Sequence, residues 1–352
     1  MNKQVLQLLE DFYSQKLLRK QIKAATNKLD ALILDLSVSY ACNLNCKHCY
    51  WGDTTLVGNP LSLNEWKTVI EAFYDQGCRH FHFSGKESSL NSQIPQLCKY
   101  VKQLDAGNFC GIISNASSNL PFFEAVSNDI DYLEISVDGL PEQHDFIRGA
   151  GSFDKMEHNL KQLISWINPE KINLATSLYE GNQSCMPEII SRFSPLGITK
   201  FFASPILPIG HAKNLSHQLI SNEDYSILIQ KIHHFLEESE QALNVYFCIQ
   251  HHTIPDFWQE DAYLRKRFEQ FLATAQNVEE KLNNSWLQFS FEFFDLPYLY
   301  QMVISPDGYV LPKPDCFHAK NYHELSLGNI STEGLKSILK KRKSAIIQSI
   351  SS

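Results

Sequence analysis

The chain has 352 residues, of which 43% are apolar and 20% charged, a composition typical of a globular protein with a sizeable core. Its 31 basic and 39 acidic residues give a net charge of −8, which argues against general binding to nucleic acid. No stretch approaches the roughly 20 apolar residues of a membrane span, and residues 1–10 do not resemble a secretory signal. The nine cysteines are better interpreted as thiols or ligands than as disulfides, so a cytoplasmic protein is expected.

The first part of the chain predicts two helices separated by a strand. Residues 1–30 look helical and polar-faced, and they are expected to lead into the fold without forming a domain. Leucine or valine then occupies every second position over residues 32–38, which is the pattern of a strand. A helix is predicted to begin at Ser62, where Glu65 completes a capping box, and to end at Gly77.

The same alternation of strand and helix continues along the chain. Further strands are predicted at residues 80–84, 109–114, 132–137, 172–178 and 199–204. Each return crossing between parallel strands needs a helix, so the six units predict a parallel α/β sheet. Six strands are too few to close an eight-stranded barrel, and we therefore expect a partial (β/α)6 TIM barrel with an open sheet. Functional residues should then lie at the C-terminal ends of the strands.

The last third of the chain is less regular. Helices are predicted at 222–243 and 256–283, and short strands at 245–248 and 290–294. Residues 302–311 predict a hairpin that turns at Pro306-Asp307-Gly308. The expected division is a lead-in (1–30), a core (31–215) and a smaller α+β module (216–352). The basic run at residues 340–343 is interpreted as the solvated end of the last helix.

Three cysteines, Cys42, Cys46 and Cys49, lie together in the loop that follows the first predicted strand. Thiolates at this spacing can hold a [4Fe–4S] cluster in which one iron has no protein ligand. An iron with an open position can bind and reduce a second molecule, so the loop indicates a catalytic site. A zinc site is the alternative, but zinc normally takes four protein ligands and His48 is poorly placed to serve with all three cysteines.

Cys-x3-Cys-x2-Cys after the first strand of a parallel α/β sheet resembles the radical S-adenosylmethionine (radical SAM) superfamily, and the resemblance covers most of the chain. It implies one [4Fe–4S] cluster whose open iron chelates SAM. Reductive cleavage of SAM would then give a 5′-deoxyadenosyl radical that abstracts hydrogen from a substrate. The resemblance also implies an external electron donor of the flavodoxin or ferredoxin type.

Residues 84–88 (Ser-Gly-Lys-Glu-Ser) align with the Gly-Gly-Glu-Pro segment of the family, which contacts the SAM amino group. A carboxylate such as Glu87 pairs with an ammonium, and Gly85 allows close approach of the backbone. Lys86 replaces the second glycine of the family, and it either clashes or adds a contact. The cofactor-binding residues that the resemblance implies are His48, Ser84, Gly85, Lys86, Glu87, Ser114, Asn115, Ser136, Asp138, Arg148, Ser204, Ile206 and Leu207.

Residues 134–153 resemble the peptide-modifying and related SPASM-type members of the family. The resemblance implies that Arg148 binds the SAM carboxylate, which suits a guanidinium fork, and that Ser136 reaches the ribose. Asp138 capping a turn is the alternative to a role in the site. Ser114-Asn115 is likewise either a ribose contact or ordinary turn chemistry.

The end of the sixth strand, from Ser204 to Leu207, resembles the adenine-binding floor of the family. The following Gly-x-Ala segment carries His211 where relatives carry an arginine. We interpret His211 as a solvated loop histidine, with a substrate contact as the alternative.

Residues 304–312 and 327–330 resemble the SPASM or shortened twitch extension, in which cysteines bind auxiliary clusters. Here Lys313 stands where a cysteine is expected, and Cys316 is the only cysteine after Cys248. One thiolate cannot hold a cluster that usually needs three or four ligands. The resemblance therefore implies a degenerate extension that covers the mouth of the barrel without a second cluster. Cys248 or Cys316 is either a hydrogen donor in the reaction or a buried inert thiol.

The substrate is not defined by these residues. A peptide or natural-product substrate is the favoured expectation, because SPASM-type relatives often modify ribosomally made peptides. A small molecule such as a sugar, a nucleoside or a tetrapyrrole is the alternative. Loss of SAM cleavage is a further alternative, which would leave a cluster-binding regulatory protein without catalysis.

Overall fold

The computed structural model describes residues 16–250, 261–274, 276–292 and 298–351. Its helices are α2 (Lys16–Asn27), α3 (Leu63–Asp75), α4 (Ile94–Leu104), α5 (Leu120–Val126), α6 (Pro141–Arg148), α7 (Ser152–Leu163), α8 (Met186–Phe193), α9 (Asn222–Glu238), α11 (Ala262–Thr274), α12 (Ile330–Glu333) and α13 (Leu335–Ser351). Its strands are β1 (Ile33–Ser39), β2 (His80–Gly85), β3 (Phe109–Ser114), β4 (Tyr132–Ser136), β5 (Ile172–Leu178), β6 (Lys200–Pro205), β7 (Asn244–Gln250), β8 (Val278–Leu282), β9 (Ser285–Glu292), β10 (Gln301–Ile304) and β11 (Val310–Leu311).

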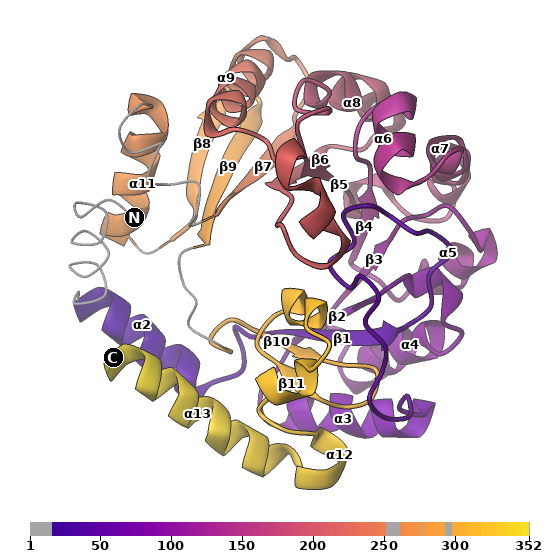
Figure 1. Cartoon of the computed structure of the whole chain (residues 1–352), viewed down its shortest axis with the longest axis vertical. Helices are drawn as coiled ribbons and strands as arrows, with labels where there is room; N and C mark the ends of the chain where they lie inside the picture. The colour runs from indigo at the N-terminus through magenta and orange to yellow at the C-terminus, as the bar shows by residue number, and fades with distance from the viewer. Residues whose placement is uncertain (1–15, 251–260, 275, 293–297, 352) are drawn as a thin grey trace.

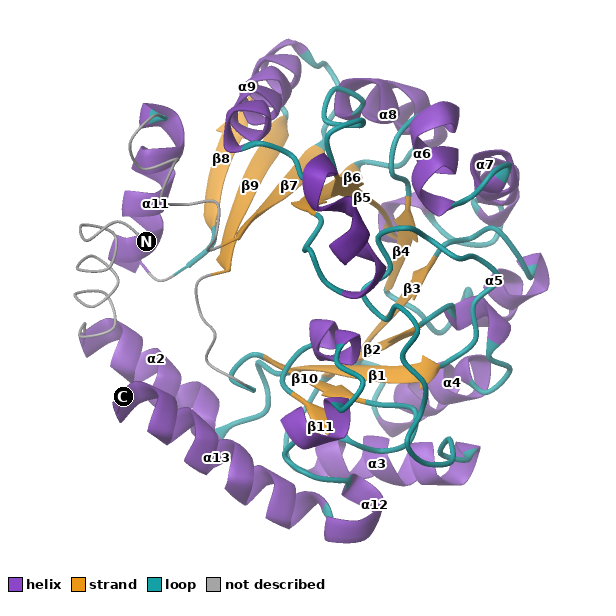
Figure 2. Ribbon diagram, viewed as in Figure 1, coloured by secondary structure: helices purple, strands orange, loops and turns teal. Residues whose placement is uncertain are grey.

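Within the described residues the strands form one sheet, in the order β11-β10-β1-β2-β3-β4-β5-β6-β7-β9-β8. The pairings from β10 to β9 are parallel, and the edge strands β11 and β8 are antiparallel to their neighbours. The sheet follows an arc with helices α3 to α9 on its outer side (Figures 1 and 2). The predicted open parallel α/β sheet is therefore confirmed, and the last third adds strands to both of its edges.

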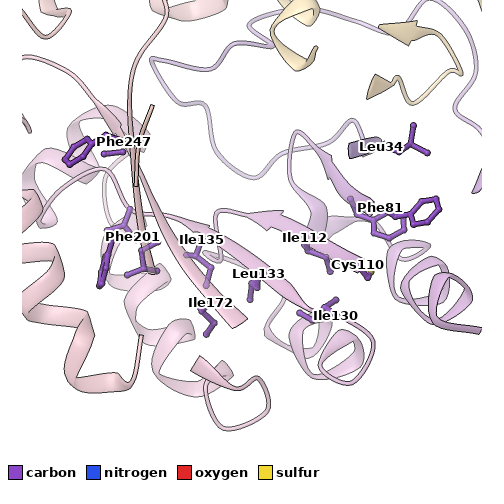
Figure 3. Packing of buried hydrophobic residues seen from close by; sticks show 14 of the residues in the cluster. Leu34, Phe81, Cys110, Ile112, Ile130, Leu133, Ile135, Ile172, Phe201 and Phe247 are labelled. Carbon is purple, nitrogen blue, oxygen red and sulfur yellow. The ribbon is translucent and has the colours of Figure 1, made fainter. Parts of the chain in front are cut away.

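Alternation along the strands separates a packed outer face from a polar inner face. Leu34, Leu36, Leu133 and Ile135 are fully buried in the main core, and Figure 3 shows such side chains packed beside the helices. Successive side chains of a strand point to opposite faces, so the residues between them face the inside of the arc. Asp35 is one of these inner residues. The inner face is thus available for chemistry while the outer face supplies the core.

The predicted capping box at the start of α3 is confirmed. The Ser62 side chain accepts from the Glu65 backbone N–H, and the Glu65 carboxylate accepts from the Ser62 backbone N–H at 2.7 Å. The helix ends just before Gly77, whose φ of 98° suits the left-handed conformation that glycine tolerates. Local sequence signals alone were sufficient to place this element.

The predicted helix over 256–283 is wrong at its C-terminal end. Residues 251–260 and 275 lie outside the described part, α11 ends at Thr274, and residues 278–282 form strand β8. The physical reason is a hairpin with β9, in which Asn283 adopts a φ of 52° at the turn. The predicted helix at 222–243, the strand at 245–248 and the hairpin at 302–311 correspond to α9, β7 and β10–β11. Strand β9 covers the predicted strand at 290–294 as far as residue 292, and residues 293–294 are not described.

The basic run at residues 340–343 lies inside α13 and not at its end. Its three lysines are exposed as predicted, but Arg342 is only 2% exposed. Its guanidinium donates hydrogen bonds to the carbonyl oxygens of Ala25 and Tyr298 at 2.9 Å and of Leu299 at 3.1 Å. One side chain therefore ties α13 to α2 and to the segment before β10.

Arg342→Ala is expected to lower the free energy of unfolding by about 3 kcal/mol, because it leaves several buried carbonyl oxygens without donors. Lys340→Ala, an exposed position of the same helix, is expected to change it by less than about 0.5 kcal/mol. Chemical denaturation of both variants measures the difference. Equal, small losses would contradict a structural role for Arg342.

Candidate active site

The three cysteines lie in the loop between β1 and α3, at the C-terminal edge of the sheet. Cys42 is exposed, whereas Cys46 and Cys49 are half-buried, and all three are free thiols. The backbone N–H of Leu44 donates to the Cys42 sulfur at 3.4 Å, and the Asn115 side-chain amide donates to it at 3.9 Å. Such N–H···S contacts favour a negatively charged sulfur.

The loop is fixed by the segment that follows β6. The backbone N–H of His211 donates to the Cys49 carbonyl oxygen at 2.9 Å. Its ring Nδ1 lies 3.1 Å from the Cys46 carbonyl oxygen, and its ring Nε2 lies 3.1 Å from an Asp53 carboxylate oxygen. Gly210 has a φ of 55°, and a Cβ there would lie 2.3 Å from the Cys49 carbonyl oxygen. The interpretation of His211 as a solvated loop histidine is therefore wrong: it braces the cysteine loop.

Arg148, at the end of α6, brings a positive charge to the same loop. Its Nε lies 2.6 Å from Oδ2 of Asp138, which is fully buried. Burial raises the pKa of the Cys46 thiol to about 11, and the Arg148 guanidinium opposes this rise. Burial alone would raise the pKa of Asp138 as well, but the Arg148 guanidinium holds it below its usual value. The buried ion pair thus holds a cation beside the cysteine sulfurs.

The Asp138 carboxylate does not cap a turn, which was the alternative considered for it, but it has another structural role. Its other oxygen accepts from the Ser177 backbone N–H at 2.7 Å. His48 Nε2 lies 3.4 Å from Asp138, and burial lowers the pKa of His48 to about 4, so its ring is neutral. Asp138 therefore connects the ends of β4 and β5 while it positions Arg148.

These residues fit an anionic iron–sulfur cluster. Three thiols in one loop are the soft ligands that such clusters use, and N–H donors and a guanidinium offset the negative charge. In the described part of the chain, no three His, Cys, Asp or Glu side chains are gathered to hold a single metal ion.

Glu87 joins the ends of β2 and β3. It is 2% exposed, and its carboxylate accepts from the Ser114 hydroxyl at 2.5 Å and from the backbone N–H groups of Asn115 at 2.7 Å and Ser89 at 3.0 Å. The structure thus brings three of the predicted cofactor-binding residues into one hydrogen-bond network. In this arrangement the carboxylate orders the strand ends, and its contact with SAM stays a prediction.

The neighbouring Gly85 allows a close backbone approach, as its residue type suggested, but the partner is protein. Its φ is 125°, and a Cβ would lie 2.0 Å from the Ser39 carbonyl oxygen at the end of β1. The Lys86 backbone N–H donates to that same oxygen at 2.8 Å, and the Lys86 ammonium lies 5.7 Å from the centre of the Trp51 ring. Both contacts are with the protein, and the effect of Lys86 on SAM binding stays a prediction.

The remaining predicted residues lie at the same edge of the sheet. Ser136 ends β4, and Ser204 lies near the end of β6, where both are half-buried. Ile206 is 6% exposed and belongs to a small apolar cluster, whereas Leu207 is half-buried. Their roles toward SAM stay predictions, although their common location agrees with them.

Part of the last third packs against the cysteine loop. The Trp51 ring stacks on Phe317 with centroids 3.9 Å apart, and the Thr54 hydroxyl donates to the Phe317 carbonyl oxygen at 2.6 Å. Cys316 is 8% exposed in the same apolar cluster, and Cys248 is 2% exposed on β7. This segment therefore covers the side of the loop that follows Cys49.

Sequence analysis did not assign a role to Asp35, which is 3% exposed on the inner face of β1. The Ser84 hydroxyl hydrogen-bonds to it, and the titratable neighbours on facing elements include His82, Glu134 and Tyr50. Burial raises the pKa of Asp35 to about 7, and the charge of Glu134 adds to the rise. The available signal was a carboxylate in the middle of an otherwise apolar strand.

Asp35 is expected to make the protein less stable as the pH rises from about 4 to about 7. Its pKa is about 7 in the folded chain against 3.8 for an ordinary Asp, so the folded state holds the proton more tightly. The free energy of unfolding should therefore fall by up to about 4 kcal/mol over this range. Asp35→Asn removes this dependence and should be the more stable protein at pH 8 but not at pH 5. Chemical denaturation at both pH values tests this, and identical pH profiles would contradict it.

Comparison with known proteins gives matches at low identity. The family model described as Radical SAM superfamily matches residues 36–178. The AdoMet-dependent heme synthase of Nitratidesulfovibrio vulgaris is 25% identical over 222 residues, which cover 61% of this chain and 59% of that protein. The sporulation killing factor maturation protein SkfB of Bacillus subtilis is 23% identical over 180 residues, 50% of this chain and 43% of that protein. The chain thus spans about half the length of these relatives.

Among solved structures, anSMEcpe with bound AdoMet and the Kp18Cys peptide superposes with a TM-score of 0.61. The match covers 90% of this chain and 83% of that one at 15% identity, which shows a shared fold. The cysteine loop and strands β2 to β5 lie within the residues that the family model matches, which also include most of β1. Residues 36–178 of this chain therefore belong to the radical SAM superfamily.

Among the described residues, no helix has the length and apolarity that a membrane span requires. The match of residues 36–178 to the family model agrees with the resemblance that the cysteine loop carries.

Proposed function

We propose that this chain is a radical SAM enzyme whose Cys42, Cys46 and Cys49 hold one [4Fe–4S] cluster. When bound, the cluster supplies the electron that cleaves SAM to methionine and a 5′-deoxyadenosyl radical. One observation carries the proposal: the three thiols lie in a loop after β1, beside groups able to offset negative charge. These groups are the N–H donors to the Cys42 sulfur and the Arg148–Asp138 ion pair. An external flavodoxin or ferredoxin would reduce the cluster.

The protein side chains bind and orient SAM in this proposal. Arg148, fixed by Asp138, would pair with the SAM carboxylate as a charge-assisted hydrogen-bond donor. Glu87 would act by ordering Ser114 and Asn115, which then face the ribose. Asp138 is buried, and both of its carboxylate oxygens already have protein partners. It therefore serves as a positioning residue and does not contact the substrate.

We propose a peptide or natural-product substrate. Support comes from the maturation protein SkfB among the curated relatives and from anSMEcpe, whose structure contains a peptide. A small-molecule substrate is the second candidate, since the relatives also include an AdoMet-dependent heme synthase. The expectation of no second cluster belongs to the same proposal, because Cys316 is the only cysteine after Cys248 and one thiolate cannot hold an auxiliary cluster.

The test is anaerobic reconstitution with iron and sulfide, followed by addition of SAM and dithionite. We expect a brown protein that forms 5′-deoxyadenosine. A brown protein that forms none would favour the cluster-binding regulatory alternative, and a colourless zinc protein would contradict both.

A further inference from the structure

The inner face of the sheet carries the carboxylates of Asp35 and Glu134. Asp35 lies on β1 and Glu134 on β4, with β2 and β3 between them. Their strand neighbours Leu34, Leu36 and Leu133 point into the outer core, so both carboxylates point inward. The charge of Glu134 contributes to the raised pKa of Asp35, which agrees with their position on the same face of the sheet.

Neither carboxylate has a cationic partner among the described residues. The Asp35 carboxylate accepts from the Ser84 hydroxyl, and Glu134 accepts from the Tyr132 hydroxyl at 2.8 Å and the Asn173 amide at 3.4 Å. Their hydrogen bonds to described side chains thus come from neutral donors. Carboxylates in such surroundings are normally paired with a positive charge.

The basic groups closest in the sheet do not supply that charge. Burial lowers the pKa of His82 to about 4, so its ring is neutral, and it stacks on Phe109 with centroids 5.4 Å apart. Lys200, at the start of β6, turns to the Glu170 carbonyl oxygen at 2.6 Å. Neither group therefore balances the charge that Asp35 and Glu134 carry once they are ionised.

Ser37 provides a second, independent observation. It is 1% exposed, and its hydroxyl has no hydrogen-bond partner among the described residues. It lies two residues after Asp35 on the same strand, so its side chain faces the same side. An unpaired buried hydroxyl is costly, and a ligand in this region would satisfy it.

We propose that the inner face of the sheet binds a cationic nitrogen of the substrate, an ammonium or guanidinium, between Asp35 and Glu134, with the Ser37 hydroxyl as a further acceptor. This inference deepens the proposed function and rests on it, because the inner face is the substrate site only if the cysteine loop above it generates the radical. The cation belongs either to a Lys or Arg side chain of a peptide or to a small amine.

The experiment measures binding by equilibrium dialysis at pH 8, with the reconstituted holoenzyme and SAM. The probes are butylammonium and an acetylated pentapeptide with a central lysine, each compared with a neutral isostere, 1-butanol or the norleucine peptide. At least one cationic probe is expected to bind at least about tenfold more tightly than its isostere, as expected for a desolvated charge pair. Preference for the peptide assigns the site to peptides, and preference for butylammonium assigns it to small amines.

Asp35→Asn and Glu134→Gln are each expected to weaken binding of the preferred cation at least about tenfold. Glu124→Gln, which removes an exposed carboxylate on α5, is the matched control and should bind like the wild type. The iron content and the absorbance near 400 nm of each variant show whether it has folded and holds its cluster.

Equal binding of charged and neutral probes to the wild type overturns the inference, even if a variant fails to fold. Binding that is unchanged in well-folded Asp35→Asn and Glu134→Gln overturns it as well. The same wild-type samples are assayed for 5′-deoxyadenosine. Formation of that product without cation preference refutes only the inference, and cation preference without product refutes only the proposed radical chemistry.

Discussion

Replacement of Cys46 by serine is expected to remove cluster iron from the protein and to reduce 5′-deoxyadenosine formation by at least about 1,000-fold, the scale on which loss of an essential catalytic group acts. The reason is that a hydroxyl is a poor replacement for a thiolate toward iron, and two remaining thiolates do not hold the cluster. Cys46 is suited to this test because it lies between the other two ligands and its backbone carbonyl is braced by His211.

Cys185→Ala is the matched control for this variant. Cys185 is a free cysteine, 6% exposed, next to α8 and away from the cysteine loop. Its loss should affect packing only, with iron content and product formation close to those of the wild type. Retention of iron and activity in Cys46→Ser would show that the loop is not the cluster site.

Gly85→Ala is expected to destabilise the protein by about 3 kcal/mol or more, because the new methyl group meets backbone that cannot yield cheaply. Its Cβ would lie 2.0 Å from the Ser39 carbonyl oxygen, so β1 and β2 would have to separate next to the cysteine loop. The variant should therefore also hold less iron after reconstitution.

Gly77→Ala separates this steric effect from the conformational cost of the residue. Gly77 has a similar φ of 98°, but no atom lies within 4 Å of the position of its Cβ. Its replacement should cost only about 1–2 kcal/mol, the price of a left-handed conformation. Denaturation curves of both variants measure the difference, and equal losses would mean that the contact with Ser39 is not limiting.

Short-range patterns were sufficient to predict much of this fold. The apolar alternation in β1 and the capping box at Ser62 and Glu65 depend on neighbours only a few residues away, and both were predicted correctly. The parallel sheet followed from the repeated order of strands and helices. The cysteine loop was predicted because its three ligands are close in sequence.

Features that depend on long-range contacts were not predicted. Residues 278–282 form a strand because β9 offers a partner, and the Asn283 turn was the missed signal. Arg342 looked like a surface residue within a basic run, but its guanidinium donates to four carbonyl oxygens from distant segments. The placement of Asp35 and Glu134 on one face of the sheet depends on the order of four strands, which no local pattern contains.

The most direct test of the central claim is electron paramagnetic resonance of the reconstituted, dithionite-reduced protein with and without SAM. If the three thiols of the loop hold a [4Fe–4S] cluster with one open iron, the protein should contain about four iron atoms per chain. Its spectrum should show a reduced-cluster signal that changes when SAM is added. A protein without such iron, or a cluster signal that SAM leaves unchanged, would contradict the account.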